Sequence, residues 1–132
     1  MDFFEKPITE DEKAIAEVLE KMHNATRSKN IDILESIVSN HAQIAIFDKN
    51  WQPIYVNKES YLEHMRALMP EIRKFDYKNV LIRVMSDTTA VVTCSRILMF
   101  SDPTRNMLHG RYFKFQKENE EWLLTRADYI GS

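Results

Sequence analysis

The residues of this sequence best suited to chemistry lie in its last third, on segments predicted to be β-strands. They are three arginines, a histidine and an aspartate: Arg96, Arg111, Arg126, His109 and Asp128. A buried arginine needs a carboxylate, a carbonyl group or a ligand as its partner, because an unpaired buried charge is costly. One aspartate cannot satisfy three arginines. Since the guanidinium fork matches a carboxylate with two parallel hydrogen bonds, the cluster predicts an anionic, carboxylate-type small-molecule ligand.

The pairing predicted for the last two strands brings these side chains to one concave wall. Period-two alternation places Trp122, Leu124, Arg126 and Asp128 on one face of the final strand. A turn over 117–121 then predicts four cross-strand neighbours: Lys117 with Trp122, Phe115 with Leu124, Phe113 with Arg126, and Arg111 with Asp128. We expect Phe113, Trp122 and Tyr55 to line the ligand pocket beside the charged residues.

The preceding strand pair is predicted in the same way, with a turn at 102–103. It sets Arg96 beside Arg111 and Leu98 beside His109. A slip of one residue would turn Arg96 to the opposite face of the sheet.

Simpler interpretations of the same residues stay open. Arg111 and Asp128 can form an ordinary cross-strand ion pair. The long side chains of Arg96 and Arg126 can extend from the sheet to water, and His109 can be an ordinary residue at the end of a strand. The histidines lack the spacing of metal ligands, so no metal is predicted. The sequence has only two glycines and hence no phosphate-binding glycine loop, and we predict no cofactor.

The elements that must position these residues follow from capping signals and periodicity. A capping box at 9–12 begins a helix that ends near Ser28, and Asn30 and Asn57 can cap two further helices, the last stopped by Pro70. Strands are predicted over 42–47, 80–85, 89–100, 107–117 and 122–129, with an extended segment over 51–56. Helices that precede an antiparallel sheet indicate an α+β fold with the helices on one face.

The strand over 89–100 is apolar on both faces. A sheet that carries helices on one side needs only one apolar face. Either this strand is strongly curved and covered on both sides, or the outer face packs against a second copy of the chain. We favour a homodimer through the outer sheet face.

Composition limits the classes of function. The 132 residues fit a single domain over 1–132, and the net charge of −2 gives no electrostatic footprint for nucleic acid or an anionic membrane. No apolar run approaches the roughly 18 residues of a membrane span, and the first residues lack the features of a signal peptide. The expected location is the cytoplasm. The single cysteine, Cys94, excludes an internal disulfide.

The order of elements, together with residues 110–115 and 122–128, resembles the nuclear-transport-factor-2-like superfamily, in particular its SnoaL-like and ketosteroid-isomerase-like branch. It is also similar to the association domain of calcium/calmodulin-dependent kinase II. The resemblance implies a cone in which three N-terminal helices pack on a curved, mixed sheet around a pocket. In many members the final strand carries a tryptophan, then two histidines and a serine at alternating positions. Trp122 fits this pattern, whereas Arg126, Asp128 and Ile130 stand where the histidines and serine would be.

Three hypotheses follow for function, and whether the protein is an enzyme stays open. The first is an isomerase, dehydratase or cyclase with Asp128 as base, Arg111 and Arg126 as a substrate clamp, and His109 as an auxiliary residue. Neighbouring arginines would lower the pKa of Asp128, which suits a base but not a proton donor. The second is a non-catalytic binding, dimerisation or assembly module. The third is a cone filled by its own side chains, which a cavity smaller than about 300 Å³ would support.

Overall fold

The computed structural model describes residues 1–130 and begins with the helices. Helix α1 (Glu10–Ser28) starts at the predicted capping box, in which Thr9 and Glu12 bond each other's backbone N–H groups. Helix α2 (Ile31–Ile37) is capped by Asn30 and α3 (Lys58–Leu68) by Asn57, as predicted. A short 3₁₀ turn, η1 (Met69–Glu71), follows α3.

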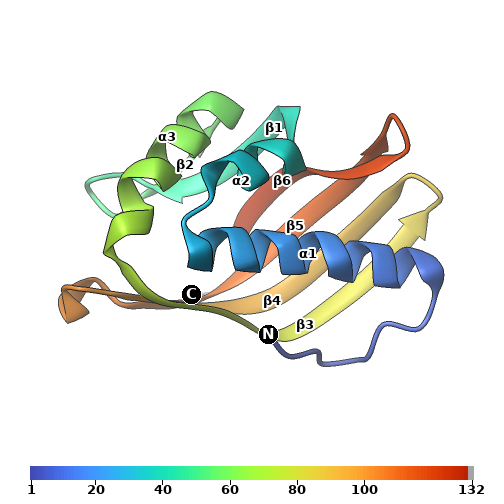
Figure 1. Ribbon diagram of the computed structural model, residues 1–132, viewed down its shortest axis with the longest axis horizontal. Helices are drawn as coiled ribbons and strands as arrows, with labels where there is room; N and C mark the ends of the chain where they lie inside the picture. The colour runs from blue at the N-terminus through green and yellow to red at the C-terminus, as the bar shows by residue number, and fades with distance from the viewer. Residues whose placement is uncertain (131–132) are drawn as a thin grey trace.

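The strands form a six-stranded sheet in the order β2-β1-β6-β5-β4-β3. They are β1 (Val38–Phe47), β2 (Pro53–Val56), β3 (Ile72–Ser86), β4 (Thr89–Phe100), β5 (Met107–Glu118) and β6 (Glu121–Ile130), with the 3₁₀ turn η2 (Pro103–Arg105) between β4 and β5. Only the β1–β6 pair is parallel, so the sheet is mixed. Figure 1 shows the three helices on one face of the curved sheet, which confirms the predicted α+β architecture.

The core lies between the helices and the inner face of the sheet, which is the face that they cover. Ile15 and Leu19 of α1 and Val92 and Phe115 of the sheet are fully buried there. Strand β3 begins at Ile72, earlier than the predicted residue 80. Asn79 within it adopts a left-handed φ of 55°, and the register shifts between Lys78 and Leu81. This bulge breaks the alternation that would have marked a single long strand.

A second bulge, in β6, changes which residues face the core. The predicted pairs Lys117–Trp122 and Phe115–Leu124 are confirmed. The next residue, Thr125, has no cross-strand neighbour on β5, and Lys114 pairs with Arg126 instead. Beyond it Phe113 pairs with Ala127 and Arg111 with Tyr129, so the predictions that placed Phe113 beside Arg126 and Arg111 beside Asp128 were wrong. A one-residue shift of register exchanges the two faces of a strand. Arg126 and Asp128 therefore lie on the outer face.

The β4–β5 register also differs from the prediction, by two residues. Arg96 pairs with His109 and Leu98 with Met107, so the predicted pairs Arg96–Arg111 and Leu98–His109 were wrong. A shift of two residues keeps every side chain on its face. Arg96, His109 and Arg111 therefore remain on the inner face.

The outer face of the sheet carries several exposed apolar side chains. Leu108 is 72% exposed, and Met99 and Ile130 are also exposed nearby on strands β4 and β6. These residues are consistent with the apolar outer face inferred from the sequence, and the homodimer stays a prediction. Within residues 1–130 no helix combines the length and apolar character needed to cross a membrane.

Candidate functional site

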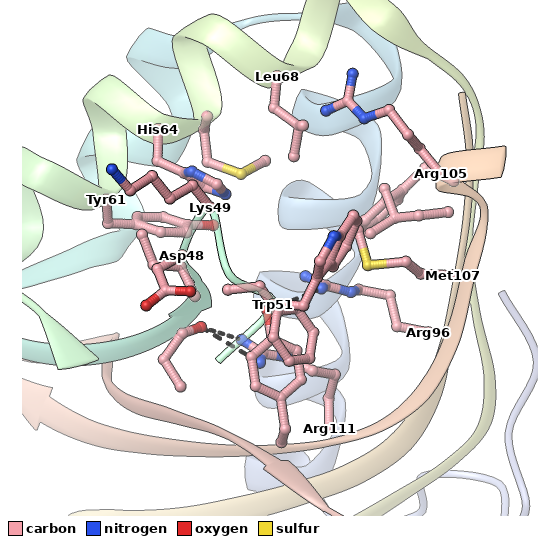
Figure 2. A pocket seen from close by; sticks show the side chains of 17 residues that line it. Asp48, Lys49, Trp51, Tyr61, His64, Leu68, Arg96, Arg105, Met107 and Arg111 are labelled. Atoms are coloured by element: carbon pink, nitrogen blue, oxygen red, sulfur yellow. Dashed lines mark hydrogen bonds between the residues drawn. The ribbon is translucent and has the colours of Figure 1, made fainter. Parts of the chain in front are cut away.

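A cavity of about 250 Å³ lies between α3 and the inner face of the sheet. Figure 2 shows its two sides: Tyr61, His64 and Leu68 come from α3, and Arg96, Met107 and Arg111 come from the strands opposite. The β1–β2 turn supplies Asp48, Lys49 and Trp51. The cavity is thus closed by a helix and a hairpin turn that lie far from Arg96 and Arg111 in the sequence.

Arg111 is the most deeply buried charge at this cavity. It is 2% exposed, and its Nη1 and Nη2 atoms donate long hydrogen bonds of 3.4 and 3.5 Å to the Ala45 carbonyl. Its Nε has no hydrogen-bond partner among residues 1–130. Its guanidinium lies 4.0 Å from the centre of the Tyr129 ring. Burial, then the charge of Arg96, lowers the pKa of Arg111 to about 10, so it is still protonated at neutral pH.

Arg96 is held by His109. Its Nε and Nη2 atoms lie 3.2 and 2.7 Å from His109 Nε2. A guanidinium can only donate, so Nε2 accepts and the neutral imidazole carries its proton on Nδ1. Burial, followed by the charges of Arg96 and Arg111, lowers the pKa of His109 to about 3. His109 therefore orients Arg96 and is unsuited to take up a proton at neutral pH.

Neither Arg96 nor Arg111 has a carboxylate partner in the part of the chain that the structure describes. The ion pairs found within residues 1–130 involve other groups. Two neighbouring positive charges at a partly enclosed cavity favour an anion, because each charge disfavours the other and burial disfavours both. The predicted anionic ligand itself stays a prediction.

Tyr61 and His64 face the arginines from α3, and sequence reasoning did not select them as functional residues. Burial raises the pKa of Tyr61 and lowers that of His64, with the charge of Arg96 lowering the latter further. Tyr61 is therefore a hydroxyl donor and His64 a neutral imidazole that can accept a proton. Their three-residue spacing, shared with Met65 and Leu68 on one helix face, was the signal that could have identified them.

The other predicted site residues form a separate network on the outer face. Arg126 Nε lies 2.7 Å from Asp128 Oδ2, and Arg126 Nη2 lies 3.0 Å from the Tyr55 hydroxyl, which also donates to Asp128. Burial raises the pKa of Asp128, but the hydrogen bonds from Arg126 and Tyr55 outweigh it, so this pKa lies below its ordinary value. None of the three residues lines the cavity.

Phe113 and Trp122 belong to the core. Both are buried, and neither lines the cavity. Phe113 still touches the site indirectly, because its ring centre lies 5.5 Å from the Arg111 guanidinium. Of the predicted residues, the structure brings together Arg96, Arg111 and His109.

Comparison with known proteins agrees with this architecture. The model of a family described as the SnoaL-like domain matches residues 15–127. A search of proteins with curated functions found no match to the sequence. Many solved structures are similar in fold, including the following three. An NTF2-like protein of unknown function from Pseudomonas putida KT2440 has a TM-score of 0.77 and 13% identity, over 96% of this chain and 90% of that one.

The two other structures carry names that suggest activities. A candidate ketosteroid isomerase from Shewanella frigidimarina NCIMB 400 has a TM-score of 0.70 and 16% identity, over 89% of this chain and 94% of that one. A candidate scytalone dehydratase from Novosphingobium aromaticivorans DSM 12444 has a TM-score of 0.72 and 12% identity, over 92% and 84%. At such identities the similarity establishes the shared fold alone.

Proposed function

The chain belongs to the SnoaL-like domain family of the nuclear-transport-factor-2-like superfamily, and from that premise we propose that its cavity binds a small organic acid through the carboxylate. The observation that carries this proposal is Arg111, which is 2% exposed and makes only long hydrogen bonds to one carbonyl, while its Nε is unpaired within residues 1–130. Arg96 supplies a second positive charge at the same cavity. A carboxylate there would complete the hydrogen bonding of both groups.

The cavity volume restricts the ligand. The cavity volume of about 250 Å³ lies below the value of about 300 Å³ under which we expected a cone filled by its own side chains. The Phe47 and Tyr129 rings, stacked 4.2 Å apart beside His109, do occupy part of the cone. The volume therefore supports the filled-cone hypothesis, while the two guanidinium groups without carboxylate partners support a ligand. Both observations are satisfied by a ligand no larger than a single-ring acid.

The experiment that tests the proposal is a thermal-shift screen with simple monocarboxylates, acetate to benzoate, at constant ionic strength. We expect the melting temperature to rise with acid concentration, as it does for any ligand that binds only the folded state. Arg96→Met should remove the shift. Arg126→Met is the matched control, because this arginine lies on the outer face and its loss should leave the shift intact.

If no acid in the screen shifts the melting temperature of the wild-type protein, the filled-cone hypothesis replaces the proposal. If Arg126→Met removes the shift and Arg96→Met does not, the ligand binds at the outer-face network instead.

A second candidate function is proton transfer on the bound acid. Tyr61 and His64 line the cavity opposite the arginines, with pKa values shifted towards a protonated phenol and a neutral imidazole. In this arrangement the arginines hold the carboxylate, His64 accepts a proton from a carbon beside a carbonyl, and Tyr61 donates a hydrogen bond to the oxygen that gains negative charge. These roles replace those predicted for Asp128 and His109, and they suit an isomerase or dehydratase.

Exchange of the C3 protons of pyruvate in D₂O, followed by proton NMR, tests this second function. The wild-type protein should accelerate exchange, and His64→Gln should lower the rate by about 10²–10⁴-fold, the usual contribution of a general base. Pyruvate affinity should change little. Asp128→Asn should retain the wild-type rate. Exchange that is lost in Asp128→Asn but kept in His64→Gln would reverse the assignment.

A further inference from the structure

Trp51 adopts a backbone conformation that a bulky residue rarely takes. Its φ is 61°, in the left-handed region. It is the last residue of the three-residue hairpin loop 49–51, which the pair Asp48 and Gln52 closes between β1 and β2. Asp48 N donates to Gln52 O at 2.9 Å, and Trp51 N donates to Asp48 O at 3.0 Å. Hairpin loops of this length usually place glycine at this left-handed position. A tryptophan here is an outlier, and such outliers are concentrated at ligand clamps and switches.

The surrounding turn keeps Trp51 in this conformation. Asp48 Oδ1 accepts hydrogen bonds from Asn50 N at 2.8 Å and from Gln52 N at 3.0 Å. The indole is nevertheless not buried by the fold, because 55% of Trp51 is exposed. The loop therefore holds a large apolar side chain partly in water, although that side chain also lines the cavity.

Aromatic rings lead from Trp51 to the buried arginine. The Trp51 and Phe47 ring centres are 6.3 Å apart, Phe47 stacks on Tyr129, and Tyr129 lies beneath the Arg111 guanidinium. Figure 2 shows Trp51 in the same part of the cavity as Arg96 and Arg111. A ligand whose carboxylate meets the arginines would have its body beside the indole and the apolar side chains of α3.

We propose that Trp51 is an aromatic cap that packs on the ring of an aromatic monocarboxylate held in this cavity, a proposal that rests on the proposed carboxylate site. One carboxylate is specified because the remaining arginine of the cavity, Arg105, is already ion-paired with Glu71. An aromatic ring is specified because an offset stack on the indole is available only to a flat ligand. The stack of the ligand ring on the indole would cover the part of the Trp51 surface that is now exposed.

Calorimetric titration of benzoate and of cyclohexanecarboxylate into the full chain tests the proposal. The two acids have similar size and the same charge, and they differ in ring planarity. Trp51→Asn is the informative variant, because asparagine tolerates the left-handed conformation and removes the indole. We expect the affinity for benzoate to fall about tenfold in Trp51→Asn, the usual loss for one aromatic stack, and the affinity for cyclohexanecarboxylate to fall by less than about threefold. Circular dichroism of the variant checks that it is folded.

Tryptophan fluorescence gives a second readout. Benzoate should change the emission of wild-type protein and of Trp122→Phe, which retains only Trp51, and should leave the emission of Trp51→Phe unchanged. If benzoate binds the wild type and Trp51→Asn equally well, the cap is overturned and the carboxylate site stands. If neither acid binds the wild type, the carboxylate site itself is overturned and the cap with it.

Discussion

Replacing Arg111 with methionine is expected to weaken carboxylate binding strongly and to raise the free energy of unfolding. Methionine fills a similar volume without a charge. The wild-type guanidinium is desolvated and has only long hydrogen bonds to the Ala45 carbonyl. Exchange of buried ionic groups for well-packed apolar ones often stabilises a protein by about 1–4 kcal/mol. Loss of a buried, charge-assisted contact to a ligand costs about 2–5 kcal/mol of binding free energy, at least about thirtyfold in affinity.

The opposite signs of these two effects distinguish a ligand site from a structural arginine. Urea titration gives the change in unfolding free energy, and calorimetry with benzoate gives the change in affinity. Arg105→Met is the matched control, since Arg105 also lines the cavity but is ion-paired with Glu71. It should alter affinity by less than about threefold. A destabilised Arg111→Met protein that binds benzoate normally would show that Arg111 serves the fold and not a ligand.

The fold was accessible from the sequence because its signals are local. The capping residues Thr9, Asn30 and Asn57 each mark a helix start that the structure confirms. A cap needs only the few residues that follow it, so no knowledge of distant contacts is required. The meander of β3 to β6 is similarly local, since each antiparallel pair is joined by a short turn.

The site was harder to predict from the sequence. The face of the sheet on which a strand residue lies depends on every residue between it and the nearest turn, because one inserted residue moves its side chain to the other face. In β6 the apolar residues change phase, from Trp122 and Leu124 to Ala127 and Tyr129. That change is the sequence signal of the bulge at Thr125, and strict alternation carried past it placed Arg126 and Asp128 on the wrong face. Arg96 and Arg111 were placed on the correct face despite a register error, because that error was two residues.

The contribution of α3 could not be obtained from strand patterns at all. The spacing of Tyr61 and His64 places both on one helix face. That they meet the arginines depends on the tertiary packing of α3 over the sheet, which this spacing does not specify. The pairing of Arg96 with His109 likewise depends on the true β4–β5 register.

The Arg96–His109 contact predicts a loss of stability in mild acid. The pKa of His109 is lowered to about 3 by burial, then by Arg96 and Arg111, against about 6.5 in an unfolded chain. Between these values the unfolded chain binds more protons than the folded protein, so the free energy of unfolding falls as pH falls. At pH 5 an unscreened shift of this size would cost about 2 kcal/mol, and partial solvent screening of the half-buried ring reduces this to about 1 kcal/mol.

His109→Gln should remove this acid sensitivity while keeping an acceptor for Arg96, because the glutamine amide oxygen can replace Nε2. At pH 7.5 we expect wild type and variant to unfold with similar free energies. From pH 7.5 to 5 the wild type should lose about 1 kcal/mol more than the variant, as measured by urea titration at each pH. Most carboxylates stay ionised in this range, and His64 titrates in both proteins, so the difference reports on His109. Parallel curves for the two proteins would mean that His109 can be protonated in the fold, and that its imidazole does not hold Arg96 by accepting its hydrogen bonds.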